Sequence, residues 1–165
     1  KGGQASVSEL VSGFEPFYND DSKLLILGSF PSVKSRQQSF YYGNPQNSFW
    51  EILSTFFGQL LPSTVQEKKE FLTLNKIALW DIVTECEIVG SADSTIKNYK
   101  IADLERLLGN CPVQKIILNG GTAYKIFLKR YKDIGVPYIK LPSTSPANAR
   151  RDDEEWYSEL RTTFM

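Results

Sequence analysis

Four short apolar runs, each bounded by turn residues, restrict the fold of this 165-residue chain more than any other feature. Short runs of this kind are typical of buried strands. In chain order they are residues 23–27, 76–80, 114–118 and 136–141. Helical patterns separate or follow them, at residues 49–57, 101–108, 123–131 and 154–164. Strands that alternate with helices predict an α/β domain whose parallel sheet carries helices on both faces.

The last helical pattern indicates how such a helix attaches to the sheet. Trp156, Leu160 and Phe164 recur at regular intervals and form one apolar stripe along the helix. The length of 165 residues fits one domain, because domains contain roughly 150 residues. We therefore expect a single domain over residues 13–165, preceded by a loose polar segment at residues 1–12.

The residues that the chain lacks exclude several classes of enzyme. It has no histidine, so Ser-His-Asp catalysis, Cys-His catalysis and HExxH zinc sites are impossible. Its two cysteines, Cys86 and Cys111, are too few for a four-cysteine zinc site or an iron–sulfur cluster held by one chain. Because free cysteines are often buried, we expect both to be buried thiols.

The charge balance and the hydropathy of the chain restrict the kinds of partner that we expect it to bind. The chain has 19 Lys and Arg residues and 19 Asp and Glu residues, so its formal net charge is zero. This balance argues against coating nucleic acid over the whole surface but allows a local basic patch. No run of about 18 apolar residues occurs, and the first residues lack the basic-then-apolar order of a signal peptide. We expect a cytoplasmic protein with no membrane contact.

Two long loops are candidates for a functional site. In open α/β sheets, ligands bind outside the carboxyl ends of the strands. The loops after Leu27 and Leu141 both begin at such ends, and both exceed the usual length of roughly 2 to 6 residues for this kind of connection. After the third strand, Gly120-Gly121-Thr122 matches no phosphate-binding motif and predicts a tight strand-to-helix connection.

The first loop ends at a helix whose start has two interpretations. Ser48 and Glu51 have the spacing of a capping box, which would leave the Asn47 amide just outside the helix and available to a ligand. Alternatively, Asn47 is itself the N-cap. Upstream, the aromatic residues 40–42 either stack on a nucleobase or pack at the edge of the sheet.

The second loop and the nearby cations also have two interpretations each. Residues 143–145 are all small and hydroxyl-bearing, so the loop could bind phosphate or enter a groove, or Ser145 could cap a helix that has Pro146 in its first turn. Lys34 and Arg36 lie in the first loop, and Arg150 and Arg151 end the second. These pairs are either phosphate contacts or parts of a solvated face.

Three ordered motifs give the chain a resemblance to a known family. They are LGSFPS at residues 27–32, YYGNPQNSFW at 41–50 and LPSTSPAN at 141–148. Together with ALWDIV at 78–83, they resemble the uracil-DNA glycosylase superfamily, and most of all its hypoxanthine-DNA (deoxyinosine) glycosylase branch. The resemblance, which runs from about residue 13 to the C-terminus, implies a three-layer α/β/α fold with a central four-stranded parallel sheet, without metal or cofactor.

The resemblance also implies roles for individual residues. The carboxylate or asparagine that other branches carry in the first motif is missing here, and Asn47 is the candidate catalytic replacement. Asn44 stands where relatives often have histidine. The implied base pocket contains Gly28, Ser29, Phe30, Pro31 and Tyr42, with Tyr42 stacked on the flipped base. The implied DNA-binding residues are Lys34, Arg36, Ser143, Thr144, Ser145, Asn148 and Arg150.

The expected function is that of a monofunctional, monomeric DNA glycosylase in base excision repair. It would flip a deaminated base out of DNA, hydrolyse its N-glycosidic bond and leave an abasic site. Hypoxanthine is the expected base, and the motifs leave the choice among hypoxanthine, uracil and xanthine open. Two alternatives are a uracil-directed glycosylase of the same fold and a non-catalytic nucleotide-binding α/β module.

Overall fold

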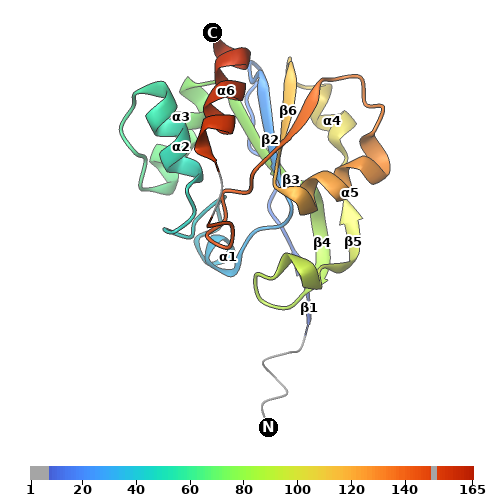
Figure 1. Cartoon of the computed structure of the whole chain (residues 1–165). Helices are drawn as coiled ribbons and strands as arrows, with labels where there is room; N and C mark the ends of the chain where they lie inside the picture. Colours follow the sequence, from blue (N-terminus) through green and yellow to red (C-terminus); the bar gives the residue numbers. More distant parts are fainter. Residues whose placement is uncertain (1–7, 150–151) are drawn as a thin grey trace.

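A parallel four-stranded sheet forms the centre of the molecule in the computed structural model, which describes residues 8–149 and 152–165 (Figure 1). The strand order is β3-β2-β6-β7, and every neighbouring pair is parallel. Each strand overlaps one of the predicted apolar runs, so the predicted sheet is confirmed. The strands are β2 (Leu24–Gly28), β3 (Ile77–Asp81), β6 (Lys115–Asn119) and β7 (Tyr138–Leu141).

Helices cover both faces of this sheet, as predicted (Figure 1). Successive side chains of a strand point to opposite faces. Leu25 and Leu27 therefore pack in one core cluster with α4 and α5, whereas Leu24 and Ile26 pack in another with α2, α3 and α6. The helices are α2 (Phe49–Phe57), α3 (Val65–Leu74), α4 (Leu104–Leu108), α5 (Gly121–Tyr131) and α6 (Asp153–Phe164).

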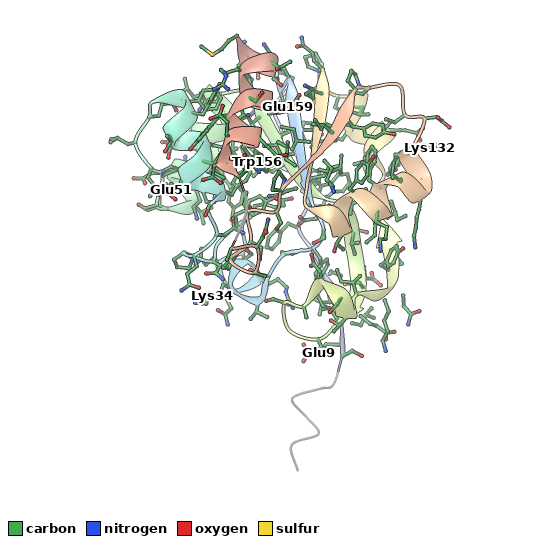
Figure 2. The ribbon with its side chains drawn as sticks, in the orientation of Figure 1. Glu9, Lys34, Glu51, Lys132, Trp156 and Glu159 are labelled. Atoms are coloured by element: carbon green, nitrogen blue, oxygen red, sulfur yellow. The ribbon has the colours of Figure 1, made fainter. Side chains whose placement is uncertain are left out.

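The C-terminal helix α6 docks by the predicted stripe. Trp156 and Leu160 are fully buried against the sheet, and Phe164 packs edge-on against Phe57, with ring centroids 5.2 Å apart. Figure 2 shows Trp156 on the side of α6 that faces the sheet. The indole Nε1 of Trp156 also donates to the carbonyl of Pro142, 2.8 Å away. The helix thereby holds the start of the second predicted site loop.

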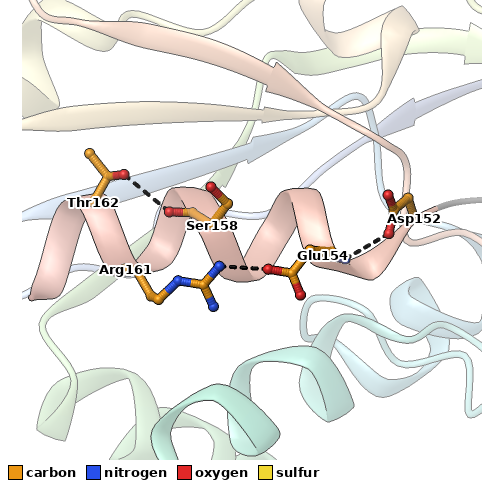
Figure 3. A network of polar contacts seen from close by, with 5 residues as sticks. All are labelled: Asp152, Glu154, Ser158, Arg161 and Thr162. Atoms are coloured by element: carbon orange, nitrogen blue, oxygen red, sulfur yellow. Dashed lines mark hydrogen bonds and ion pairs between the residues drawn. The ribbon is translucent and has the colours of Figure 1, made fainter.

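Polar contacts stabilise the exposed side of α6 (Figure 3). Asp152 caps the helix by accepting a hydrogen bond from the backbone N–H of Glu154 at 3.0 Å. Arg161 pairs with the Glu154 carboxylate one to two turns along the helix, at 2.5 Å. Surface pairs of this kind contribute roughly 0 to 1 kcal/mol, so burial of Trp156 and Leu160 dominates the attachment of α6.

A second, antiparallel sheet with the order β1-β4-β5 was not predicted. Its strands carry many charged and exposed side chains, so they lack the apolar runs from which the central sheet was inferred. Residues Glu9–Ser12, part of the segment expected to be loose, form β1, while residues 1–7 lie outside the described residues. The other two strands are β4 (Val83–Ile88) and β5 (Lys97–Ile101).

Two further short elements complete the described chain, and both border the predicted site. Helix α1 (Val33–Gln38) follows the first motif and begins where Ser32 accepts a hydrogen bond from the Ser35 N–H. A 3₁₀ helix, η2 (Asp93–Thr95), lies between β4 and β5. Both cysteines are buried, as predicted. No described helix is long and apolar enough to cross a bilayer.

Candidate functional site

A cavity of about 500 Å³ opens at the carboxyl edge of the central sheet. Three of its walls are strand ends: Gly28 of β2, Asp81 of β3 and Asn119 of β6. The loops that follow β2 and β7, together with η2, supply the rest. Cavities that hold small polar ligands have volumes of roughly 300 to 1,000 Å³, so this one is of suitable size for a nucleobase.

Most of the predicted site residues come together here. Lys34 and Arg36 do not line the cavity, and Arg150 lies outside the described residues. The predicted residues that line it are Gly28, Ser29, Phe30, Pro31, Tyr42, Asn47, Ser143, Thr144, Ser145 and Asn148.

The geometry of Asn47 resolves the two interpretations of the helix start. Its Oδ1 accepts a hydrogen bond from the Phe49 N–H at 2.9 Å, whereas Ser48 makes no side-chain cap hydrogen bond. The predicted capping box of Ser48 and Glu51 is therefore wrong, and the Asn47 side chain supports the first turn of α2. Its Nδ2 donates to none of the described residues. Asn47 thus binds the helix with its oxygen and keeps an amide donor in the cavity wall.

The aromatic residues 40–42 divide between the two expected roles. Phe40 and Tyr41 are 5% and 3% exposed, so they pack in the core beside the sheet. Tyr41 also borders the cavity, as does Tyr42, whose ring stacks on Phe49 with centroids 4.0 Å apart and planes 20° apart. Tyr42 has a φ of 53°, in the left-handed region that residues other than glycine seldom adopt. The prediction that Tyr42 stacks on a flipped base stays a prediction.

Gly28 leaves space at the floor of the cavity. A methyl group at this position would stand 2.6 Å from Asp81 Oδ1 and 3.1 Å from the Tyr42 hydroxyl. Only glycine therefore lets these two side chains approach the backbone of β2 so closely. The next residue, Ser29, donates from its hydroxyl to Asp93 of η2 at 2.8 Å, which ties the first motif to the antiparallel sheet's connecting loop.

The second loop is anchored by a reciprocal pair of hydrogen bonds. Asn119 Nδ2 donates to Thr144 Oγ1 at 3.0 Å, and the Thr144 N–H donates to Asn119 Oδ1, also at 3.0 Å. Thr144 is 1% exposed, so its side chain holds the loop against β6. The DNA-binding role of Thr144 stays a prediction. Gly120 makes the tight connection predicted before α5, with a φ of 102°.

The rest of that loop forms a single turn and no helix. The Asn148 N–H donates to the Ser145 carbonyl at 2.9 Å, and the Ala147 N–H donates to Ser145 Oγ at 3.2 Å. Helix α6 begins only at Asp153. The interpretation in which Ser145 caps a helix is therefore wrong, because residues 146–147 form a turn where that helix would begin. Ser143, Ser145 and Asn148 remain half-buried in the cavity wall.

The two cationic side chains predicted to contact phosphate from the first loop, Arg36 and Lys34, differ in their contacts with the rest of the protein. Arg36 donates from Nη2 to the Gly90 carbonyl at 2.7 Å and from Nε to the Pro31 carbonyl at 3.3 Å. It braces the first motif against the end of β4. Lys34 is exposed on α1 next to this loop (Figure 2). A phosphate contact stays a prediction for both residues.

Asp81 is the residue that sequence reasoning missed and that the structure places most centrally. It is 5% exposed, lines the cavity, and its Oδ2 has no hydrogen-bond partner. Burial, with a smaller contribution from the charge of Asp93, raises the pKa of Asp81 to about 8. The nearby Tyr42 hydroxyl is also buried and makes no hydrogen bond of normal geometry. Burial strongly raises the pKa of Tyr42, and the nearby Asn119 side chain lowers it by less.

Asn119 was missed as well, and the sequence contained a signal for both residues. Asp81 and Asn119 are polar residues at the ends of apolar strands, and the carboxyl ends of parallel strands meet at one edge of the sheet. Asp93 had no comparable signal, because it reaches the cavity through an unpredicted loop. Within the described ranges, no group of three or more acidic or thiol side chains is arranged to hold a metal ion.

The fold and the cavity define a class of protein: a three-layer α/β/α domain that takes a small polar ligand at the carboxyl edge of its sheet. The model of the uracil DNA glycosylase superfamily matches residues 15–163. The chain belongs to this superfamily, and the resemblance carried by the three motifs is confirmed.

Individual relatives cover nearly the whole chain. A protein named hypoxanthine DNA glycosylase from Methanosarcina acetivorans is 33% identical over 153 residues, which are 90% of this chain and 97% of the relative. A protein of the same name from Methanosarcina barkeri is 34% identical over 139 residues, 84% of this chain and 88% of the relative. The solution NMR structure of a candidate uracil DNA glycosylase from M. acetivorans superposes with a TM-score of 0.82 at 33% identity, covering 95% of this chain and 100% of that one.

Proposed function

We propose that this chain is a monofunctional DNA glycosylase that hydrolyses the N-glycosidic bond of deoxyinosine, releases hypoxanthine and leaves an abasic site for base excision repair. The observation that carries the proposal is the cavity itself, which the three family motifs line with amide and hydroxyl groups at the carboxyl edge of the sheet. Two relatives of nearly the same length are named hypoxanthine DNA glycosylases. The substrate is DNA whose damaged base is flipped out of the stack, which costs least where pairing is weak.

The residues present suit a reaction that needs little acid–base chemistry. As the glycosidic bond breaks, positive charge grows on the sugar and negative charge on the departing base. Preorganised hydrogen-bond donors stabilise such charge effectively in a site that excludes water. Asn47 Nδ2 is such a donor, because Oδ1 holds the side chain against the Phe49 N–H. We propose that Asn47 hydrogen-bonds either the leaving base, through Nδ2, or the attacking water, through the second lone pair of Oδ1.

DNA contacts follow from the position of the second loop. Ser143, Ser145 and Asn148 stand in the cavity wall on a loop that Thr144 anchors from beneath. This supports a role in entering the groove beside the flipped base. Exposed Lys34 on α1 suits a contact to phosphate, which positions DNA without reading its sequence.

The proposal is tested with duplexes that carry one deoxyinosine, deoxyuridine or deoxyxanthosine, followed by alkali to cleave abasic sites. We expect cleavage to be fastest with deoxyinosine. Faster cleavage at deoxyuridine would instead identify a uracil-directed enzyme. Tight binding of free nucleotides without any cleavage would identify a nucleotide-binding module and overturn the proposal.

The nature of the product is tested separately. No described residue that lines the cavity is a lysine, so no amine stands where it could form a Schiff base with the sugar. We expect strand breakage only after alkali. A protein–DNA adduct trapped by borohydride would contradict the monofunctional mechanism.

Asn47→Asp separates the two roles of Asn47. Aspartate keeps an oxygen to accept from the Phe49 N–H, and its charge suits a helix N-terminus, so the fold is retained. If Nδ2 donates to the leaving base, single-turnover excision of hypoxanthine falls by roughly 100-fold to 1,000-fold, the typical cost of losing one preorganised donor. If Asn47 instead orients the water through an acceptor oxygen, Asn47→Asp stays within tenfold of the wild type.

Two controls accompany this variant. Asn47→Ala removes both groups and should lose activity in either case, so wild-type excision by it would refute the role of Asn47. Asn19→Asp makes the same chemical change at the opposite edge of the sheet, before β2, where Nδ2 donates to Thr73 in an exposed contact. It should leave excision unchanged.

A further inference from the structure

The floor of the cavity contains buried polar groups that the mechanism above does not use. Asp81 is 5% exposed and its Oδ2 has no hydrogen-bond partner, and the Tyr42 hydroxyl beside it makes no hydrogen bond of normal geometry, although the Asn119 side chain lies close enough to lower its pKa. Both side chains crowd the same point on Gly28, at 2.6 Å and 3.1 Å from where a Cβ would stand. Buried polar groups in proteins are nearly always satisfied, so an unpartnered carboxyl that lines a ligand cavity points to a group that a ligand completes.

The surroundings of Asp81 oppose its ionised form. The acidic group facing it is Asp93 from η2, and Tyr41 and Tyr42 face it from the loop before α2. The described residues that line the cavity include neither lysine nor arginine. Burial and the like charge of Asp93 therefore keep the Asp81 carboxyl protonated near neutral pH, since its pKa is raised to about 8.

A protonated carboxyl has an O–H that donates a hydrogen bond, whereas a carboxylate only accepts. Deamination replaces an amino group of a base, which donates, by a keto oxygen, which accepts. A buried carboxyl kept neutral by its surroundings is an effective donor to an oxygen on which negative charge develops. An ionised carboxylate at the same place would repel that oxygen.

We propose that Asp81 acts as a neutral acid whose O–H donates a hydrogen bond to the 6-keto oxygen of hypoxanthine, so that this side chain contacts the base and favours the deaminated purine. The inference rests on the proposed function for the identity of the base. Asp81 keeps its proton throughout the reaction. The hydrogen bond strengthens as the electron pair of the glycosidic bond moves onto the base, and the carboxyl is unchanged after the base is released.

The test compares the pH dependence of Asp81→Asn with that of the wild type. Asparagine keeps an N–H donor and cannot ionise, so the ratio of wild-type to variant single-turnover rates isolates the titration of Asp81. Titration of the inosine base is common to both proteins and cancels in this ratio. We expect a constant ratio from pH 6 to about pH 7.5 and a fall approaching tenfold per pH unit above the pKa of about 8.

Two further variants complete the experiment. Asp81→Leu fills the space without a donor, and we expect excision of hypoxanthine at least tenfold slower at every pH, with the thermal unfolding temperature confirming a folded protein. Asp133→Asn removes an exposed carboxyl on the loop after α5 and should follow the wild type throughout.

Binding of free hypoxanthine by the same proteins keeps this inference separate from the proposed function. If the wild type excises no deaminated base, the proposed function fails, and the pH dependence of hypoxanthine affinity then decides the role of Asp81 alone. A rate or affinity ratio that stays flat from pH 6 to pH 9.5 overturns the inference. Wild-type rates in Asp81→Leu, or no binding of hypoxanthine by the wild type, also overturn it.

Discussion

The floor and the wall of the cavity both contain buried polar side chains, but those in the wall are hydrogen-bonded to each other whereas the Asp81 carboxyl at the floor has an oxygen without a partner. In the wall, Asn119 and Thr144 are 9% and 1% exposed and exchange two hydrogen bonds of 3.0 Å. At the floor, Asp81 is buried just as deeply, and neither its Oδ2 nor the Tyr42 hydroxyl makes a hydrogen bond of normal geometry. Asp81 ends β3 and Asn119 ends β6, on either side of β2 in the same sheet.

This difference separates structure from function within one site. A satisfied buried pair rigidifies the segments that it joins, here β6 and the loop after β7. An unsatisfied buried group lowers stability, and proteins retain such groups where a ligand completes them. The wall therefore positions the loop, and the floor is left incomplete for the base.

The largest expected effect is on the stability of Asp81→Asn at alkaline pH. The pKa of Asp81 is raised from 3.8 to about 8 in the folded protein, so the folded state binds more protons than the unfolded state between these values. The wild type therefore loses stability as pH rises from about 4 to about 8, by roughly 1.4 kcal/mol per pH unit. Asparagine does not titrate, so the variant should be more stable by a few kcal/mol at pH 8.

Urea denaturation at pH 4, 6 and 8 measures this difference. The advantage of Asp81→Asn should shrink as pH falls and stop changing below the ordinary carboxyl pKa of 3.8, where Asp81 is protonated in the folded and the unfolded state alike. Asp133→Asn, which changes an exposed carboxyl, should show no such trend. A difference that does not vary with pH would show that Asp81 is not a neutral acid in the folded protein.

A smaller loss is expected when the wall pair is broken. Asn119→Ala removes both hydrogen bonds to Thr144 and leaves the buried N–H of Thr144 unsatisfied. We expect the free energy of unfolding to fall by about 2 kcal/mol. The amide of Thr144 should also exchange with solvent faster. Asn110→Ala, which removes two exposed hydrogen bonds, is the matched control and should cost less than half as much. Equal costs would show that the wall pair contributes little.

The smallest expected effects come from two variants that each remove one hydroxyl, one from the wall and one from the floor. Comparing them gives the sharpest test of the difference between the two regions. Thr144→Val keeps the shape of the side chain but deprives Asn119 Nδ2 of its acceptor, and we expect a loss of about 1 kcal/mol. Tyr42→Phe removes a hydroxyl that has no partner, so stability should be unchanged or slightly raised. Thermal unfolding of both variants measures the pair. Equal losses would mean that the Tyr42 hydroxyl has a partner in solution.

The central sheet and most of the helices that cover it followed from the sequence because their signal is local. An apolar run such as residues 24–27, or the stripe that Trp156 and Leu160 form, shows its burial in the spacing of neighbouring residues. The antiparallel sheet gave no such signal, because β5 is largely exposed and β4 alternates buried positions with glutamates. Its pairing depends on contacts between segments distant in the chain.

The same distinction, between patterns of neighbouring residues and contacts of distant ones, applies to the site. Two of the loops that form the cavity, and the family that the three motifs indicate, could be inferred from the sequence because both are patterns of adjacent residues. The loop that contains Asp93 could not. It took the folded structure to show that Asn47 uses its oxygen for α2, that Thr144 is buried against Asn119, and that Asp81 lies against Gly28. These properties arise between residues far apart in sequence, and the protonation of Asp81 in particular follows from burial and from Asp93, neither of which its neighbours in the chain reveal.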